Sequence, residues 1–308
     1  EDLLAPVIEQ ASGKRCDVDF DVCFQPEFLR EGTSIRDYDN PPFTIVGVTS
    51  DRPNKKLHKV FGHLPCDFHV TSIRTAEMIK YCCNNFHTVK ITYANEIARL
   101  CEALKVNPFE VMDLVCQDRQ LNISSAYLRP GYAFGGSCLP KDLRATLYMA
   151  KQRDLNLPML ASLMRSNQEH IDHAFEKVMS MGERRVGMIG LAFKSGTDDL
   201  RESPLVTLAE RLLGKGMDIV IYDPEVSLSR LLGANKRYIE EHIPHIGELL
   251  RPSLQNVVAH GPVLVLGSGD KQVQTELKAL LQPHHRLIDL APMKDITDLP
   301  CIYEGLCW

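Results

Sequence analysis

Long apolar runs are absent from this chain of 308 residues, and no stretch approaches the ~20 apolar residues that cross a membrane. The first residues also lack the pattern of a signal peptide. The net charge of −5 is spread along the chain, without a basic cluster that would neutralise nucleic-acid phosphates or an anionic membrane. We therefore expect a cytoplasmic protein that binds neither nucleic acid nor membrane.

Recognisable metal and disulfide patterns are also missing. No Cys-x-x-Cys pair occurs among the ten cysteines, and the histidines lack companion ligands at zinc-like spacing. Cysteines scattered in this way are typical of reduced thiols. We expect no metal site and no disulfide framework.

The amounts of apolar and charged residues are those of an ordinary soluble globular protein, at 44% and 24%. A chain of this length can bury one large core or two modest ones. Two α/β units are therefore the first expectation.

Hydrophobic periodicity divides the chain into three parts. The first part predicts a short helix over 1–13 and strands over 20–24, 44–48 and 68–70, too few for an independent sheet. Helical spacing then predicts one long helix over 75–104, a second begun by Asn107-Pro108, and further helices over 140–153 and 158–181.

The last part alternates between strands and helices. Strands are predicted over 186–191, 218–222, 263–266 and 287–290, with helices over 204–213 and 273–281. This alternation predicts a doubly wound parallel sheet and an α/β fold class. The predicted domains are 1–73, a helical middle over 74–182, and an α/β domain over 183–308.

The segment from Gly135 to Asp142 places Cys138 in a glycine-rich turn at the start of a predicted helix. Pro140 suits the first helical position and Asp142 the first turn, so the thiol lies beside unsatisfied backbone N–H groups. Those groups and Lys141 should favour the thiolate form of Cys138. The alternative is a buried cysteine beside a glycine cap.

Other polar residues are placed where they could serve the same chemistry. Lys80 and Asn84 are four residues apart on the long helix and share a face, although such a pair is often only a solvated stripe. Glu27 and Glu31 follow a predicted strand, which an ordinary acidic turn would also explain. Lys194 and Arg201 occupy a loop that suits an anion.

Four motifs in order resemble the family of UDP-glucose and GDP-mannose dehydrogenases. They are Pro26-Glu27-Phe28-Leu29-Arg30-Glu31-Gly32-Thr33-Ser34-Ile35, Ala76-Glu77-Met78-Ile79-Lys80-Tyr81-Cys82-Cys83-Asn84-Asn85, the segment from Arg129 to Asp142, and Phe193-Lys194 with Arg201-Glu202-Ser203. The segments from Arg36 to Pro42 and from Arg129 to Phe134 look more like the GDP-mannose branch.

The resemblance implies an NAD-dependent oxidation of a nucleotide sugar to its uronic acid, of the kind that serves polysaccharide biosynthesis. The substrate it implies is GDP-mannose, oxidised to GDP-mannuronate in four electron equivalents through a thiohemiacetal and a thioester on Cys138. It also implies an intertwined homo-oligomer, at least a dimer.

Residue roles follow from the same resemblance. Lys80 and Asn84 would stabilise an oxyanion, Asp142 would activate water, and Glu27 would serve acid and base steps. Residues expected near the NAD cofactor are Glu31, Lys141 and Arg201. Residues expected at the nucleotide sugar are Arg129, Tyr132, Phe134, Gly135 and Lys194, with Arg129 reaching a neighbouring subunit's substrate.

Two departures from the family pattern matter. Gln25 stands where the family has Asn before Pro-Glu, and no strand–Gly-x-Gly-x-x-Gly–helix unit occurs in the chain. We therefore expect residues 1–73 to be the C-terminal remnant of a Rossmann-like NAD-binding domain, with weak or absent turnover.

Three alternatives stay open on the sequence. They are a UDP-glucose 6-dehydrogenase, a non-catalytic nucleotide-sugar-binding or oligomerisation module, and a thiol hydrolase using Cys138. The last is the weakest, because no histidine occupies a motif that would pair it with the cysteine.

Overall fold

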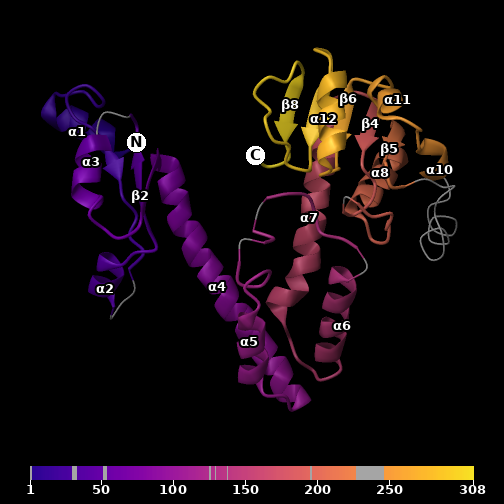
Figure 1. Cartoon of the computed structure of the whole chain (residues 1–308). Helices are drawn as coiled ribbons and strands as arrows, with labels where there is room; N and C mark the ends of the chain where they lie inside the picture. The colour runs from indigo at the N-terminus through magenta and orange to yellow at the C-terminus, as the bar shows by residue number, and fades with distance from the viewer. Residues whose placement is uncertain are drawn as a thin grey trace. The chain divides into compact units, whose positions relative to one another are not determined.

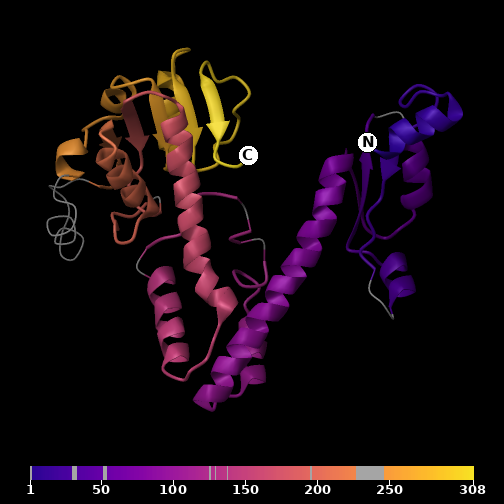
Figure 2. The same cartoon turned by 180° about the vertical axis from the view of Figure 1, so that it is seen from behind.

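The computed structural model describes residues 2–29, 33–50, 54–124, 126–128, 130–136, 138–194, 196–226 and 246–308. The chain forms two compact units, Glu1–Asn95 and Glu96–Trp308, called here the N-terminal and C-terminal units. Each is described by itself below, and Figures 1 and 2 show their elements from opposite sides.

The N-terminal unit contains a small mixed sheet of order β1-β2-β3. Strand β1 is antiparallel to β2, and β2 is parallel to β3. The elements in chain order are α1 (Leu4–Ser12), β1 (Cys23–Phe24), α2 (Ser34–Asp39), β2 (Phe43–Val48), α3 (Asn54–Phe61), β3 (Asp67–Ser72) and the start of α4 (Ile73–Leu104).

Helix α4 begins directly against strand β2. A Cβ atom at Gly47 would lie 2.6 Å from the Cα atom of Ile73 and 2.9 Å from the Cβ atom of Ala76, so only glycine allows this approach. Ile73 and Ala76 are both buried there. The helix is 32 residues long in all and ends within the C-terminal unit, which confirms the single long helix predicted from the sequence.

The strand predicted over 20–24 is wrong in its extent, because β1 holds only Cys23–Phe24. Phe20 instead pairs with Cys16 in an isolated bridge that closes a local turn. Helices α2 and α3 were not predicted from the sequence, because both are short. In the described part of α3, Leu57 is the one buried hydrophobic residue, so the helix has little apolar periodicity.

The helical part of the C-terminal unit contains the end of α4, α5 (Pro108–Gln117), α6 (Leu139–Lys151) and α7 (Pro158–Ser180). As predicted, Asn107 caps α5 by accepting hydrogen bonds from the N–H groups of Phe109 and Glu110. Leu100 of α4 packs with Ala150, Leu157 and Leu160 in a small core between α4, α6 and α7.

The N-terminus of α7 is capped by a residue from a different helix. Leu157 at its N-cap position offers no side-chain acceptor, and the buried carboxylate of Glu96 accepts from Met159 N–H at 2.8 Å and Leu160 N–H at 3.0 Å. A negative charge is favoured at this end of a helix. Glu96 thus ties α4 to α7.

The sheet of the C-terminal unit has five parallel strands in the order β5-β4-β6-β7-β8. This confirms the predicted parallel sheet, with β8 as an added edge strand that was not predicted. Its elements are β4 (Arg185–Ile189), α8 (Pro204–Gly214), β5 (Asp218–Tyr222), α10 (Ile246–Leu249), α11 (Leu254–Val258), β6 (Val263–Leu266), α12 (Lys271–Leu280), β7 (Arg286–Asp289) and β8 (Ile302–Gly305).

Helices cover both faces of this sheet (Figure 1). Buried residues of α7 and α8 pack on one face, and those of α11 and α12 pack on the other. From β4 the chain passes through α8 to β5 on one side, whereas β6 lies on the other side of β4. The carboxyl ends of β4 and β6 therefore form a switch point, the usual place for a ligand in such sheets.

None of the described helices combines the length and the apolar character needed to cross a membrane.

Candidate active site

Cys138 lies at the N-cap position of α6, immediately before Leu139, and its side chain is exposed. Pro140 is therefore the second helical residue, one later than the sequence suggested. Asp142 lies in the first turn, and its N–H donates to the carbonyl oxygen of Cys138 at 2.9 Å. An exposed thiol at the start of a helix lies beside backbone N–H groups that have no partner within the helix.

The two glycines before Cys138 are needed because their backbone packs tightly. A Cβ atom at Gly135 would lie 2.3 Å from the carbonyl oxygen of Glu202 and 2.6 Å from Pro204. A Cβ atom at Gly136, whose φ is 84°, would lie 2.7 Å from the ring of Phe193. The loop between β4 and α8 thus supports the turn that carries Cys138.

Arg201 lies in that loop and forms an ion pair with Asp199. Its guanidinium donates two hydrogen bonds of 2.8 Å to the carboxylate of Asp199. The pKa of Arg201 is raised chiefly by that hydrogen bond, and Cys138 contributes in the same direction. The motifs that contain Arg201 and Cys138 are separate in the sequence, and the structure packs them together where the carbonyl oxygen of Glu202 lies against Gly135.

Lys141 and Asp142 contact each other beside Cys138. The Nζ atom of Lys141 lies 3.5 Å from a carboxylate oxygen of Asp142, and both side chains are more than 60% exposed. The positive charge of Lys141 therefore lies near the start of α6, where the carboxylate of Asp142 partly offsets it.

Helix α7 holds the segment that precedes the cysteine. Asn167 accepts from Phe134 N–H and donates to the Phe134 carbonyl, both at 2.9 Å. The hydroxyl of Tyr132 donates to the carbonyl of Pro204 at 3.3 Å, and burial raises the pKa of Tyr132. Asn167 was not predicted, because a single Asn inside a helix carries no recognisable signal.

A cavity of about 640 Å³ lies at the carboxyl edge of the parallel sheet. The ends of β4, β6 and β7 contribute to it, together with the start of α12. Its lining is Gly131, Tyr132, Ala133, Phe193, Lys194, Pro204, Leu205, Gly267, Gly269, Lys271, Gln274, Thr275, Lys278, Leu290, Ala291, Pro292, Lys294 and Asp295. Tyr132 and Lys194 of the predicted substrate site both line it.

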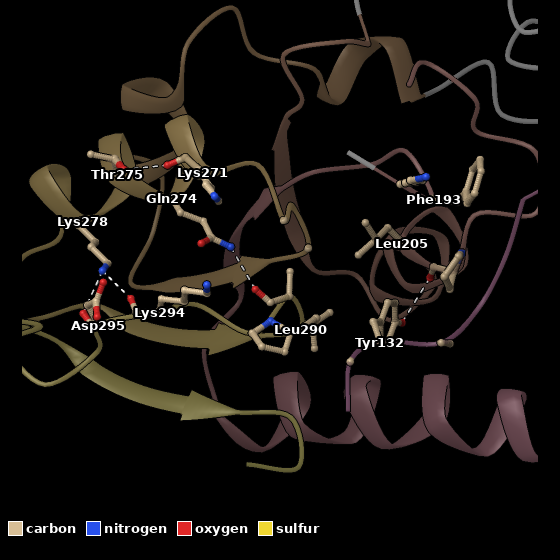
Figure 3. A pocket seen from close by; sticks show the side chains of 18 residues that line it. Tyr132, Phe193, Leu205, Lys271, Gln274, Thr275, Lys278, Leu290, Lys294 and Asp295 are labelled. Carbon is tan, nitrogen blue, oxygen red and sulfur yellow. Dashed lines mark hydrogen bonds between the residues drawn. The ribbon is translucent and has the colours of Figure 1, made fainter. Parts of the chain in front are cut away.

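Three of the four lysines that line the cavity lie at one end of it. Figure 3 shows Lys271, Lys278 and Lys294 there, whereas Tyr132 and Phe193 lie at the other end. Four lysines and one aspartate line the cavity as a whole, which favours an anionic ligand. Of these lysines, only Lys194 was singled out in the sequence.

Two hydrogen-bonded side chains shape the cavity wall. The amide of Gln274 donates to the carbonyls of Ser268 at 3.2 Å and Ala291 at 3.1 Å, which joins the loops after β6 and β7 (Figure 3). Lys278 donates to the carbonyls of Lys294 and Asp295, at 2.6 and 2.9 Å.

Asp223 fixes the backbone that leads to Lys194. One of its carboxylate oxygens accepts from Leu191 N–H at 2.7 Å and from Ala192 N–H at 3.0 Å. These groups lie just after β4, where the chain turns toward Phe193 and Lys194. Asp223 follows β5, and its role was not predicted from the sequence.

The remaining predicted catalytic residues lie in the N-terminal unit. The ammonium of Lys80 donates to a carboxylate oxygen of Glu27 at 2.8 Å and to the Glu27 carbonyl at 2.5 Å. The pKa of Glu27 is lowered, chiefly by the hydrogen bond from Lys80 and then by one from Leu29 N–H. Asn84 is exposed one helical turn after Lys80, on the same face of α4.

A second cavity, of about 540 Å³, lies beside this pair within the N-terminal unit. Its lining includes Glu27, Phe28, Cys83 and His87. Glu31 and Arg129, predicted for the cofactor and the substrate, lie outside the described residues. In the part of the chain that the structure describes, no three His, Cys, Asp or Glu side chains cluster closely enough to hold a metal ion.

Comparison with family models accounts for most of the chain. The NAD binding domain of the UDP-glucose/GDP-mannose dehydrogenase family matches residues 1–65, its central domain matches 74–169, and its UDP binding domain matches 187–289. The chain belongs to the UDP-glucose/GDP-mannose dehydrogenase family. It is thus homologous to NAD-dependent nucleotide-sugar 6-dehydrogenases, and part of the lining of the cavity at the sheet edge lies in the stretch that matches the UDP binding domain.

Curated relatives support the same assignment. GDP-mannose 6-dehydrogenase of Pseudomonas aeruginosa is 48% identical over 306 residues, which cover 99% of this chain and 70% of that protein. The enzyme of the same name from Pseudomonas putida is 47% identical, over 100% of this chain and 70% of its own length. A UDP-glucose 6-dehydrogenase of Haloferax volcanii is 37% identical, over 72% of this chain and 53% of its own length.

A solved structure of a relative has the same fold. GDP-mannose dehydrogenase from Pseudomonas aeruginosa, described as a ternary complex, matches with a TM-score of 0.92 over 99% of this chain and 69% of its own chain. A UDP-glucose dehydrogenase from Pyrobaculum islandicum is 28% identical, with a TM-score of 0.51 over 98% of this chain and 66% of that one.

Proposed function

We propose that this protein oxidises the C6 alcohol of GDP-mannose to the carboxylate, giving GDP-mannuronate, with Cys138 as the nucleophile. The observation that carries the proposal is the exposed Cys138 thiol at the start of α6, which follows a turn that packs against the loop carrying Arg201. The similarity to GDP-mannose 6-dehydrogenases over 99% of the chain supports the choice of sugar nucleotide.

The cofactor is NAD+, which supplies the oxidant for two successive two-electron oxidations. Lys141 in the first turn of α6 and Arg201 in the loop between β4 and α8 are the described residues that would contact it. Their positive charges fit a pyrophosphate. The chain matches the family's NAD binding domain over residues 1–65, which supports this choice of cofactor.

Cys138 acts between the two oxidations. Its sulfur adds to the C6 aldehyde carbon, and the aldehyde oxygen takes a proton to give a thiohemiacetal. The second oxidation converts this species to a thioester. Water then attacks the thioester carbonyl, the carbon–sulfur bond breaks, and the carboxylate leaves while the thiol is restored.

The other predicted catalytic residues have roles in these steps. Lys80 and Asn84 stabilise the oxyanion, Glu27 transfers protons, and Asp142 positions the water. The exposed carboxylate of Asp142 and the ion-paired carboxylate of Glu27 have the chemistry that these roles need.

We propose that the cavity at the sheet edge binds the nucleotide of the sugar nucleotide. Its lysines suit a diphosphate, and Tyr132 and Phe193 offer apolar surface to the rest of the ligand. The alternative substrate, UDP-glucose, is favoured by the UDP binding domain match over residues 187–289.

We also propose that a second copy of this chain covers the apolar surface of α4. Met78, Tyr81, Val89 and Ile91 on this helix are 60%, 67%, 51% and 63% exposed. Large apolar side chains exposed along one long helix are typical of an interface. Light scattering should give at least a dimer, and a monomer at every concentration would contradict this proposal.

The function is tested without turnover by thiol protection. The C6 aldehyde of GDP-mannose should form a reversible thiohemiacetal and slow alkylation of Cys138 by iodoacetamide, read by peptide mass spectrometry. Cys307, which is also exposed, is the internal reference and should not be protected. Equal alkylation of Cys138 with and without the aldehyde, in folded protein, would refute the proposed nucleophile.

A further inference from the structure

One wall of the cavity at the sheet edge is formed by residues 290–295, which follow β7 and are called here the β7 loop. Apart from Met293, every residue of this loop lines the cavity. The loop is irregular, so its path is not set by the repeating hydrogen bonds of a helix or a sheet. The side chains that bind its backbone therefore determine the shape of this wall.

Asp289 is the last residue of β7, and its side chain is fully buried. Its carboxylate accepts from Ala291 N–H at 2.9 Å and from Met293 N–H at 2.7 Å. A third hydrogen bond, of 2.8 Å, comes from the hydroxyl of Tyr303 on β8. Asp289 is not among the residues that line the cavity, so any effect that it has on the cavity passes through the β7 loop.

Tyr303 is itself held as a donor to Asp289. Its hydroxyl oxygen accepts from the indole N–H of Trp308 at 3.1 Å, which leaves the hydroxyl proton for the carboxylate. Burial, followed by the hydrogen bond with Asp289, raises the pKa of Tyr303 to about 12, so the hydroxyl keeps its proton at neutral pH. The main chain adds a bond of 2.9 Å from Leu306 N–H to the Asp289 carbonyl. The edge strand β8 and the residues after it thus fix Asp289.

Helix α12 binds the carbonyl groups of the same loop. Gln274 donates to the carbonyl of Ala291, and Lys278 donates to those of Lys294 and Asp295 (Figure 3). Asp295 has a φ of 54°, in the left-handed region that a residue with a side chain seldom adopts. Such a conformation persists where the surroundings impose it, and it is often found at ligand sites.

A local turn would not need a buried carboxylate. Asp118 makes similar contacts, with Gln120 N–H and Leu121 N–H at 2.9 Å, from a partly exposed position. Burying a carboxylate is costly unless hydrogen bonds compensate for the lost water, so a buried charge seldom adds net stability. The consequence of burying Asp289 is instead a fixed path for the β7 loop.

We propose that Asp289, supported by Tyr303, is a positioning residue for the nucleotide, holding the β7 loop so that Lys294 contacts the diphosphate. The proposal rests on the nucleotide site proposed above for this cavity. Asp289 and Tyr303 do not themselves contact the ligand.

The test is calorimetric titration of the full chain with GDP-mannose, comparing the wild type with Asp289→Asn and Tyr303→Phe. Asp289→Asn keeps the shape of the side chain and loses at least one acceptor, so binding should weaken about tenfold, and about threefold in Tyr303→Phe. Hydrogen exchange of the amides of Ala291 and Met293, read by mass spectrometry of peptides across the loop, should become faster in the same order.

Glu96 provides the matched control. Its buried carboxylate also accepts from two backbone N–H groups, at the start of α7 and outside the cavity. Glu96→Gln should lower the melting temperature as Asp289→Asn does, and it should leave the affinity for GDP-mannose unchanged. Tyr303→Phe removes only a hydroxyl group, so it keeps the test valid if Asp289→Asn does not fold.

A double-mutant cycle separates a displaced loop from a general loss of the site. Lys294 belongs to the β7 loop and Lys271 to α12, and both line the cavity. The loss of affinity caused by Lys294→Ala should be roughly threefold smaller in the Asp289→Asn background than in the wild type. The loss caused by Lys271→Ala should be the same in both backgrounds.

Wild-type affinity in folded Asp289→Asn and Tyr303→Phe would overturn the positioning proposal, as would an equal loss in Glu96→Gln. An undiminished effect of Lys294→Ala in the Asp289→Asn background would also overturn it. If the folded wild type binds no GDP-mannose, while exchange at Ala291 and Met293 still responds to Asp289→Asn, the proposed nucleotide site fails and the structural role of Asp289 in the loop remains.

Discussion

Lys80 and Glu27, 53 residues apart in the sequence, form an ion pair of 2.8 Å in the N-terminal unit. Lys80 is proposed to stabilise an oxyanion and Glu27 to transfer protons, so the pair joins residues with two different proposed roles. The side chain of Lys80 is 25% exposed and that of Glu27 is 56% exposed. The carboxylate of Glu27 is consequently held in its ionised, proton-accepting form by the cation that lies beside it.

Replacing Lys80 with Met should raise the pKa of Glu27 toward its ordinary value of 4.5, because the strongest cause of the lowered pKa is lost. The pKa can be followed by carbon-detected NMR titration of the Glu27 carboxyl. Lys90→Met is the matched control, since Lys90 lies over the ring of Phe86 on the same helix. No rise in Lys80→Met, or an equal rise in the control, would refute the pairing.

Glu96→Ala should destabilise the C-terminal unit by about 2–3 kcal/mol, since the start of α7 loses the acceptor for one buried and one partly buried N–H group. Urea unfolding of the two proteins measures the difference. Glu102→Ala on the exposed face of the same helix should change stability by no more than about 0.5 kcal/mol. Similar losses in both variants would contradict the capping role.

Sequence patterns predicted the elements whose signals are local. Asn107 followed by Pro108 identified the start of α5, and apolar periodicity identified the long helix α4. The strands β4 to β7 were recognisable as short apolar runs separated by helices. The motif around Cys138 led correctly to the start of α6.

Side chains that act on distant segments were missed. Glu96 looks like any charged residue on a helix, because the N–H groups that it accepts from lie 63 and 64 positions later. Arg144 likewise pairs with Glu202 across 58 residues. Lys271 and Lys294 become parts of one cavity only when β6 and β7 pair.

The stability of the C-terminal unit should fall as the pH decreases below 6.5, in part because of His285. Burial lowers the pKa of this histidine from its ordinary value of 6.5, so the unfolded chain binds the proton more readily than the folded one. Its contribution is therefore complete above pH 6.5 and is lost as the pH falls toward the lower, folded pKa.

Melting temperatures between pH 7.5 and 5.5 measure this dependence. The slope should be reduced more in His285→Gln than in His284→Gln, because burial, and not the charge of His284, is the main cause of the lowered pKa of His285. An unchanged slope in His285→Gln would show that another group is responsible.

Lys194→Ala should weaken the binding of GDP-mannose about tenfold or more, because a lysine that lines the cavity loses its charge-assisted contact with the diphosphate. Lys215→Ala, at the exposed end of α8 outside the cavity, is the control and should bind as wild type does. Calorimetry gives both affinities. Equal affinity of the Lys194 and Lys215 variants for GDP-mannose would show that Lys194 does not contact the diphosphate.

The most direct test of the account is calorimetric titration of the chain with GDP-mannose, and with UDP-glucose under the same conditions. The account predicts saturable binding of GDP-mannose at one site per chain and markedly weaker binding of UDP-glucose. Preference for UDP-glucose would contradict the proposed substrate, and no binding of either compound by folded protein would contradict the nucleotide-sugar site itself.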